Sequence, residues 1–148
     1  MSTTVQDLLR IKGAMVETTE GGASIREAIR QMARGRIGCL AVVTKTGKLS
    51  GIVSERDCLW KAVAAGKPLR TTLVKEVMTP VRDMKTVTPH TSVDRCMELM
   101  TGRRHRHLPV VEDGKLTGLV SIGDVVKYEI DAKEATIQSL EKYITGSL

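Results

Sequence analysis

The hydrophobic positions along the chain follow one pattern twice. Each copy contains a short extended segment, an amphipathic helical stretch, a nearly continuous apolar run, a glycine-containing turn, a second apolar run and another helical stretch. The first apolar run of each copy, at 39–43 and 108–111, is typical of a buried strand, which has no polar face. The order therefore predicts two β-α-β-β-α units.

The two copies also match residue by residue. Positions from Ser24 to Val43 align with the second copy at a spacing of 68, and positions from Gly47 to Asp57 align at a spacing of 67. The single-residue change falls in the turn between the apolar runs, where a change of length costs little. A unit of about 55 residues buries too little surface for a core of its own. We therefore expect an α+β fold, similar to an α/β sandwich, in which the two units pair about a pseudo-twofold axis.

Local signals predict where the elements begin and end. Ser24, with Glu27 three residues later, forms a capping box that starts a helix, and Asp113-Gly114 is typical of a hairpin turn. The expected strands are 16–19, 39–43, 49–53, 85–88, 108–111 and 116–120. The expected helices start at 24, 57, 91–92 and 124.

The chain divides into four segments, which are a lead-in at 1–14, the first repeat at 15–66, the second repeat at 74–130 and a C-terminal helix at 131–148. In the last segment Ile137, Leu140 and Ile144 recur at i, i+3 and i+7, which predicts an apolar stripe along one helix face. Such a stripe packs on this chain or on a partner chain, and we favour packing in a homodimer.

The charge of the chain admits an anionic partner. The net charge is +6, but the basic residues are spread along the whole sequence. Aromatic residues make up only 2% of the chain and Phe is absent, so base-stacking platforms have little to be built from. We therefore do not expect nucleic acid as the partner.

Membrane and secretion signals are weak. No run of 18 apolar residues occurs, and the N-terminal residues lack the hydrophobic core of a signal peptide. The cysteines, Cys39, Cys58 and Cys96, are odd in number and widely spaced, which favours reduced thiols inside a cell. We expect a cytoplasmic protein without a membrane partner, with an organelle matrix as the alternative compartment.

A Ser-x-x-Asp motif follows the second apolar run of each repeat, at 54–57 and at 121–124. A strand that ends at a helix start would gather a hydroxyl, a carboxylate and free backbone N–H groups at one point. That set suits a sugar hydroxyl beside a phosphate. The alternative is that each Ser only caps its helix and each Asp only complements the helix dipole. Two copies at one place in a repeat favour the ligand site.

These features resemble a pair of CBS domains, the tandem called a Bateman module. The resemblance rests on the repeated strand with Ser-x-x-Asp, the HLPVV strand at 107–111, the Met-Thr-Pro start of the second repeat at 78–80 and the repeat length. It covers residues 5 to 130, and the tail resembles that of stand-alone CBS-pair proteins. The resemblance implies binding of an adenine nucleotide, whose ribose the Asp holds, and dimers of stacked modules.

The resemblance also implies which residues bind the ligand. Ser54 and Asp57 would serve one site, and Ser121 and Asp124 the other. The remaining positions implied for ligand binding are Gly38, Cys39 and Arg56 in the first repeat and Lys85, Arg106 and His107 in the second.

The two implied sites are not equivalent. Arg106 can pair with a phosphate, whereas its counterpart Gly38 cannot, and Arg56 has Gly123 as its counterpart. We therefore expect two different sites, either of which is empty or prefers its own nucleotide.

The basic run at 103–107 has two interpretations. It is a solvated helix end and loop, or it is a phosphate cradle formed chiefly by Arg106 and Arg104. Its histidines, with His90 and Cys96, do not have the spacing of metal ligands, so we expect no metal site. All three histidines lie in the second repeat and no nucleophile motif occurs, so we expect neither catalytic residues nor an enzyme.

The sequence thus predicts a regulatory module that binds an adenosine-containing ligand between its repeats. The candidate ligands are AMP, ADP, ATP, NAD and S-adenosylmethionine. Because no effector domain accompanies the repeats, the module would regulate another protein in trans. Two alternatives remain, a nucleic-acid-binding module and a structural dimeric adaptor with empty clefts.

Overall fold

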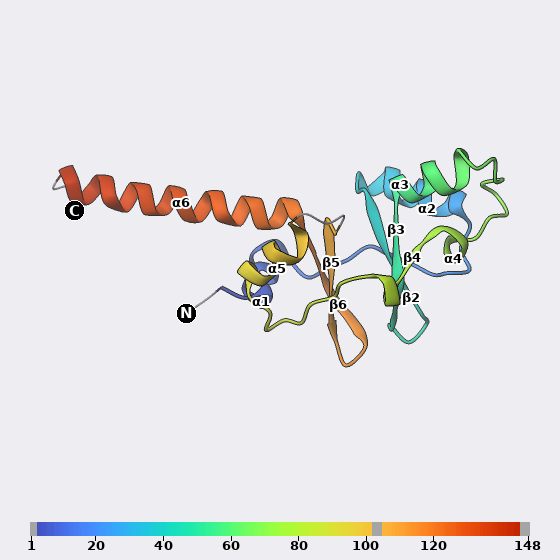
Figure 1. Cartoon of the computed structure of the whole chain (residues 1–148), viewed down its shortest axis with the longest axis horizontal. Helices are drawn as coiled ribbons and strands as arrows, with labels where there is room; N and C mark the ends of the chain where they lie inside the picture. The colour runs from blue at the N-terminus through green and yellow to red at the C-terminus, as the bar shows by residue number, and fades with distance from the viewer. Residues whose placement is uncertain (1–2, 102–104, 146–148) are drawn as a thin grey trace.

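A computed structural model describes residues 3–101 and 105–145 of the chain. Two β-sheets stand side by side, each covered by helices, and one long helix extends from the body (Figure 1). This mixed α+β arrangement is the predicted fold class.

The first repeat contains a sheet with the strand order β1-β2-β3-β4. Strand β1 runs parallel to β2, and the other pairs are antiparallel. The elements are β1 (Thr18–Thr19), α2 (Ile25–Gly35), β2 (Cys39–Val43), β3 (Leu49–Ser54), α3 (Glu55–Asp57), the π-helical turn η1 (Cys58–Val63) and β4 (Thr79–Pro80). The helix predicted to start at 57 is therefore only partly correct. It begins at Glu55, and its second part hydrogen-bonds from i to i−5, as from Ala64 N to Leu59 O at 2.8 Å.

The second repeat contains a two-stranded antiparallel sheet. Its elements are η2 (Val81–Asp83), α5 (Val93–Met100), β5 (His107–Glu112), β6 (Lys115–Ser121) and α6 (Ile122–Thr145). The predicted hairpin turn is confirmed, because Asp113 and Gly114 both have positive φ angles, of 54° and 79°.

The predicted strand at 85–88 is wrong. Val87 alone bridges to Val110, through hydrogen bonds from Val87 N to Pro109 O at 2.9 Å and from Val111 N to Val87 O at 2.8 Å. The next bonds of a parallel ladder would need donors at Pro109 and Pro89, which have no N–H. The first repeat has Ala41 in place of Pro109, and Ala41 N donates to Glu17 O at 3.2 Å.

The core of each repeat includes a short helix that comes, in the sequence, at or before the start of the other repeat. Val5 and Leu8 of helix α1 (Val5–Lys12) belong to the core cluster of the second repeat. Val74 and Val77 of helix α4 (Val74–Val77) belong to the cluster of the first repeat. Helix α1 of the lead-in therefore contributes to the second repeat's core, and neither repeat buries its apolar residues alone.

A pseudo-twofold axis passes between the two hairpin turns. Lys48 bridges to its own counterpart, Lys115. On one side Leu49 N donates to Gly114 O at 3.3 Å, and on the other Leu116 N donates to Gly47 O at 3.2 Å. Because equivalent residues exchange equivalent bonds, the predicted pairing of the repeats is confirmed.

The last helix differs from the prediction, in which a separate C-terminal helix followed the second repeat. Helix α6 runs without a break from Ile122 to Thr145, and the final predicted residues, 146–148, lie outside the described part of the chain. Neither Pro nor Gly occurs between 124 and 145, so nothing in the sequence stops the helix at 130.

Candidate functional site

The first Ser-x-x-Asp motif forms the corner where β3 enters α3. Ser54 N donates to Asp57 Oδ2 at 2.9 Å, and Asp57 N donates to Ser54 Oγ at 3.1 Å. This reciprocal pair is a capping box, so the predicted N-cap role of Ser54 is confirmed. The capping bonds reach only Oδ2, and Asp57 Oδ1 faces Lys61 Nζ at 2.9 Å.

The second motif repeats this geometry where β6 enters α6. Ser121 N donates to Asp124 Oδ2 at 2.8 Å, and Asp124 N donates to Ser121 Oγ at 3.1 Å. Among the described residues, the contacts of Asp124 fall on Oδ2. Asp124 Oδ1 takes part in none of these contacts.

The residues predicted to line each site lie beside these corners. Cys39 pairs with Ser54 across the sheet, and Glu55 N donates to Gly38 O at 2.9 Å. In the second repeat His107 pairs with Ser121 in the same way.

The bond equivalent to that between Glu55 and Gly38 also recurs in the second repeat, where Ile122 N donates to Arg106 O at 2.8 Å. The structure therefore brings together Gly38, Cys39, Ser54 and Asp57 at one corner and Arg106, His107, Ser121 and Asp124 at the other.

The two aspartates have different counter-ions. Lys61, one helical turn after Asp57, is local to its own helix. Lys12 comes from α1, and its Nζ lies 2.5 Å from Asp124 Oδ2 and 2.7 Å from Leu119 O. The side chains of Lys12 and Asp124 are 33% and 22% exposed, so solvent screens this pair only in part.

Sequence reasoning missed Lys12 as a site residue. The sequence does contain a pattern that bears on Lys12, because Val5 and Leu8 of the lead-in align with Val74 and Val77 at a spacing of 69. That alignment marks the two segments as equivalent. Only the tertiary structure shows that each one crosses to the other repeat, which carries Lys12 to Asp124.

Electrostatics set the protonation of the second corner. Burial raises the pKa of Asp124, but the Lys12 ammonium and the Ser121 N–H outweigh it, so the net pKa lies below the ordinary value. Burial lowers the pKa of His107, and Lys12 and Arg106 add to this effect against the opposing charge of Asp124. The corner therefore holds an ionised carboxylate beside a neutral imidazole at pH 7.

Two predicted residues lie apart from these contacts. The guanidinium carbon of Arg56 lies 6.0 Å from the centre of the Trp60 ring, a cation–π arrangement. Lys85 lines a cavity of about 370 Å³, whose lining includes neither Ser121 nor Asp124. Arg103 and Arg104 of the basic run lie outside the described residues.

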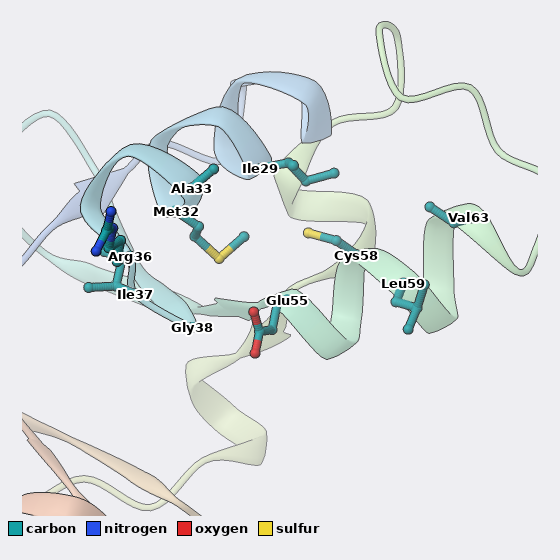
Figure 2. Close-up of a pocket in the computed structure, with 10 residues that line it drawn as sticks. All are labelled: Ile29, Met32, Ala33, Arg36, Ile37, Gly38, Glu55, Cys58, Leu59 and Val63. Carbon is teal, nitrogen blue, oxygen red and sulfur yellow. The ribbon is translucent and has the colours of Figure 1, made fainter.

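A larger cavity, of about 470 Å³, opens beside the first corner (Figure 2). It lies between α2 and η1, and the side chains of Met32 and Cys58 extend toward each other across it. The lining residues are Ile29, Met32, Ala33, Arg36, Ile37, Gly38, Glu55, Cys58, Leu59 and Val63. Ser54 and Asp57 do not line this cavity, but Gly38 and Glu55 do, so the cavity adjoins the polar corner.

The cysteines are packing residues. Burial raises the pKa of the Cys39 and Cys58 thiols to about 11 and raises that of Cys96 as well, so all three are protonated at neutral pH. Across the described residues, no cluster of three or more His, Cys, Asp or Glu side chains could hold a metal ion. No described helix is long and apolar enough to cross a membrane.

The model of the CBS domain family matches residues 15–63 and 74–131, which are the two repeats. The chain belongs to the CBS-domain family. Its sequence is 38% identical to the mitochondrial CBS domain-containing protein CBSX3 of Arabidopsis thaliana, over 98% of this chain and 73% of that protein.

Solved CBS-domain structures share the fold. The CBS domain NE2398 is 42% identical with a TM-score of 0.80, over 88% of this chain and 99% of that one. The CBS-domain protein ATU1752 from Agrobacterium tumefaciens is 41% identical with a TM-score of 0.77, over 86% and 99%. CBSX2 from Arabidopsis thaliana, solved in complex with AMP, is 25% identical with a TM-score of 0.72, over 88% and 98%.

Proposed function

We propose that this CBS-domain protein is a non-catalytic sensor that binds an adenosine-containing ligand in the cleft between its repeats. The observation that carries the proposal is the duplicated corner, in which a capped helix start, a hydroxyl and a carboxylate recur with the same hydrogen bonds. Capping requires one carboxylate oxygen, and at Asp124 the second oxygen takes no part in the contacts of Oδ2. A ribose with two adjacent hydroxyls suits such an acceptor.

The second corner is the better equipped of the two for a nucleotide. The start of the 24-residue helix α6 favours an anion, as helix N-termini do. The Lys12 ammonium contacts the Asp124 carboxylate. When a ribose hydroxyl binds that carboxylate, the ammonium can contact a ligand phosphate instead. Arg106, whose backbone lies at the same corner and whose charge acts on His107, supplies a second cation.

A relative supports the ligand class. CBSX2 has been solved with AMP, and its fold matches this chain over most of its length. We therefore assign AMP, ADP, ATP, NAD and S-adenosylmethionine as the candidate ligands of Asp57 and Asp124.

The output acts on another protein. Ligand binding in the cleft would favour one arrangement of the two repeats, and a regulated partner that distinguishes the arrangements would respond in trans. We further propose that the sensor is a homodimer. Side chains at equivalent positions of the two repeats are about half exposed, namely Leu59, Val63, Val126 and Ile130. The compartment proposed is a reducing one, the cytoplasm or an organelle matrix, and the relative CBSX3 is mitochondrial.

Thermal unfolding in the presence of nucleotides tests the sensor. Wild-type protein would be heated with AMP, ADP, ATP, NAD, NADH or S-adenosylmethionine at about millimolar concentration. A ligand at about 100 times its Kd adds about 2.7 kcal/mol to the free energy of unfolding, so Tm should rise by several degrees. The double variant Asp57→Asn/Asp124→Asn keeps an oxygen for the capping bonds but removes both charges, and it should lose the shift.

Asp7→Asn is the matched control. Asp7 accepts a bond from Thr4 N at 3.0 Å in the capping box of α1, so this variant changes a cap without changing either corner. It should keep the full nucleotide shift. If no adenosine ligand raises Tm, the sensor proposal fails and the structural adaptor becomes the better interpretation. Salt-sensitive binding to nucleic acid without any response to free AMP would favour the nucleic-acid module.

A further inference from the structure

Helix α1 is packed at its start and exposed at its end. Val5 and Leu8 lie in the core of the second repeat, whereas every residue from Arg10 to Met15 is exposed. The chain then passes to β1, the edge strand of the first repeat's sheet (Figure 1). Residues 13–17 therefore form a connector that joins the core of one repeat to the sheet of the other.

This connector is held at both ends. At its far end Ala41 N donates to Glu17 O at 3.2 Å, which ties the connector to the first repeat. At its near end the Lys12 ammonium donates to Leu119 O at 2.7 Å and to Asp124 Oδ2 at 2.5 Å. The Lys12 side chain therefore anchors the last turn of α1 to the second corner.

The Lys12 anchor lies where the phosphate of a nucleotide is expected. Helix α6 begins at this corner, and a helix N-terminus favours an anion. A ribose hydroxyl is neutral, so its hydrogen bond to Asp124 brings no new counter-ion to the ammonium. A phosphate beside the corner does bring one, and a charge-assisted hydrogen bond between an ammonium and a phosphate is among the strong ones.

We propose that Lys12 transmits the presence of a phosphate in the second corner to the connector between the repeats. The proposal rests on the nucleotide site proposed above and specifies how its occupancy is read. The existing pair of Lys12 and Asp124 is partly exposed, and such pairs hold a side chain only weakly. A bound phosphate adds a stronger contact, so a nucleotide fixes the end of α1, whereas a nucleoside such as adenosine does not.

The counter-ion of the first corner acts within its own repeat. Lys61 Nζ lies 2.9 Å from Asp57 Oδ1 and donates to Val77 O, at the end of α4, at 3.2 Å. The chain after α4 enters β4 of the same sheet. A phosphate in the first corner should therefore leave the connector at 13–17 unchanged.

Hydrogen exchange without ligand tests the anchor. Amides of the peptide 10–17, among them that of Gly13, should exchange about three- to tenfold faster in Lys12→Met than in wild-type protein. Arg10→Met is the matched control, because it removes the same charge from the same helical turn, where Arg10 faces Asp7 at 3.7 Å. It should leave the exchange unchanged. Amides of the peptide 5–9 should respond to neither variant, because Val5 and Leu8 are buried in the core.

Saturating AMP and adenosine test the coupling. In the Asp57→Asn background, which isolates the second corner, AMP should slow exchange in the peptide 10–17 about three- to tenfold, and adenosine should not slow it. Addition of Lys12→Met should abolish the slowing at AMP concentrations that calorimetry shows to be saturating. In the reciprocal Asp124→Asn background AMP occupies the first corner, and its addition should not change the exchange.

The outcomes separate the coupling from the nucleotide site. Equal exchange in wild-type protein and Lys12→Met, or an equal effect of Arg10→Met, shows that Lys12 is no anchor and overturns the coupling. AMP that binds the second corner without slowing exchange, or that slows it equally in Lys12→Met, overturns the coupling and leaves the sensor standing. If neither AMP nor any other adenosine ligand binds, the sensor and the coupling fail together.

Discussion

The two repeats have the same corner but are closed by different segments. In the first repeat, β4 continues the sheet beyond β3, and α4 completes the core from the middle of the chain. In the second repeat, α1 takes the place of α4 and comes from the N-terminal end. The described sheet there stops at two strands. A sequence duplication therefore preserves what lies within a repeat, while the exchanged segment makes the two sites different.

The counter-ions show the chemical result of this difference. Lys61 contacts Asp57 from the next turn of the helical segment that Asp57 begins, so the first ion pair does not depend on which helix, α1 or α4, completes the core. Lys12 reaches Asp124 from 112 residues away in the sequence. Val81, the counterpart of Lys12 at a spacing of 69, brings no charge to the first corner. The predictions below test this asymmetry.

Glycine substitutions should have the largest effect and should differ between the repeats. A Cβ atom at Gly51 would lie 2.3 Å from Thr79 O, a backbone atom of β4. A Cβ atom at Gly118 would lie 2.8 Å from Leu9 Cδ1, the end of a side chain that can rotate away. We expect Gly51→Ala to lower the free energy of unfolding by about 3 kcal/mol and Gly118→Ala by about 1 kcal/mol. Urea denaturation measures both, and equal losses would contradict the asymmetry.

The second-largest effect should come from the removal of one carboxylate charge. Asp124→Asn deletes a charge-assisted hydrogen bond to ribose, worth about 1.5–3 kcal/mol, so affinity at the second site should fall about ten- to a hundredfold. Calorimetry with AMP in an Asp57→Asn background isolates that site. Asp57→Asn should act in the same way in the reciprocal background, and Asp7→Asn should leave both affinities unchanged. Full affinity in Asp124→Asn would reject its role.

Lys12 should matter only when the ligand carries a phosphate. In the Asp57→Asn background, Lys12→Met should weaken AMP binding about three- to tenfold, since a partly exposed charge contact contributes about 1 kcal/mol. Adenosine has no phosphate, so its affinity should not fall. Parallel titrations with the two ligands measure the ratio. An equal loss for both would show that Lys12 only supports the shape of the corner.

His107 should give the smallest effect, visible in the pH dependence of stability. Its pKa is lowered in the folded chain, mainly by burial, so below pH 6.5 the unfolded chain binds more protons than the folded one. Stability should therefore be complete above about pH 6.5 and decline as the pH falls. His107→Gln should remove part of that decline.

Tm measured from pH 7.5 to 5 tests this prediction. Asp124 does not alter the comparison, because its lowered pKa makes a contribution that is lost only as the pH falls below about 4. An unchanged slope in His107→Gln would assign the decline to other groups. Cys39, the counterpart of His107, does not titrate in this range, because its pKa is about 11.

Local pattern predicted much of this protein. The boundaries of β2 are those expected from the apolar run, and Ser54 and Ser121 cap their helices as the Ser-x-x-Asp motif predicted. Such features depend on contacts within a turn or between neighbouring strands. The pairing of the repeats also followed from the sequence, because a unit of this size cannot bury a core alone.

Contacts between distant segments could not be predicted in the same way. The sequence indicates that α1 and α4 are equivalent, but the choice of which repeat each one covers depends on how the two cores fit together. That choice places Lys12 at Asp124 and lowers the pKa of this carboxyl. Likewise, the apolar residues of the tail predicted a helix, but only the continuous α6 shows that its stripe faces away from the core. The sequence by itself therefore determined the repeat and its corner. The tertiary structure decided what surrounds that corner, because the free energy of packing depends on surfaces that meet only in the folded chain.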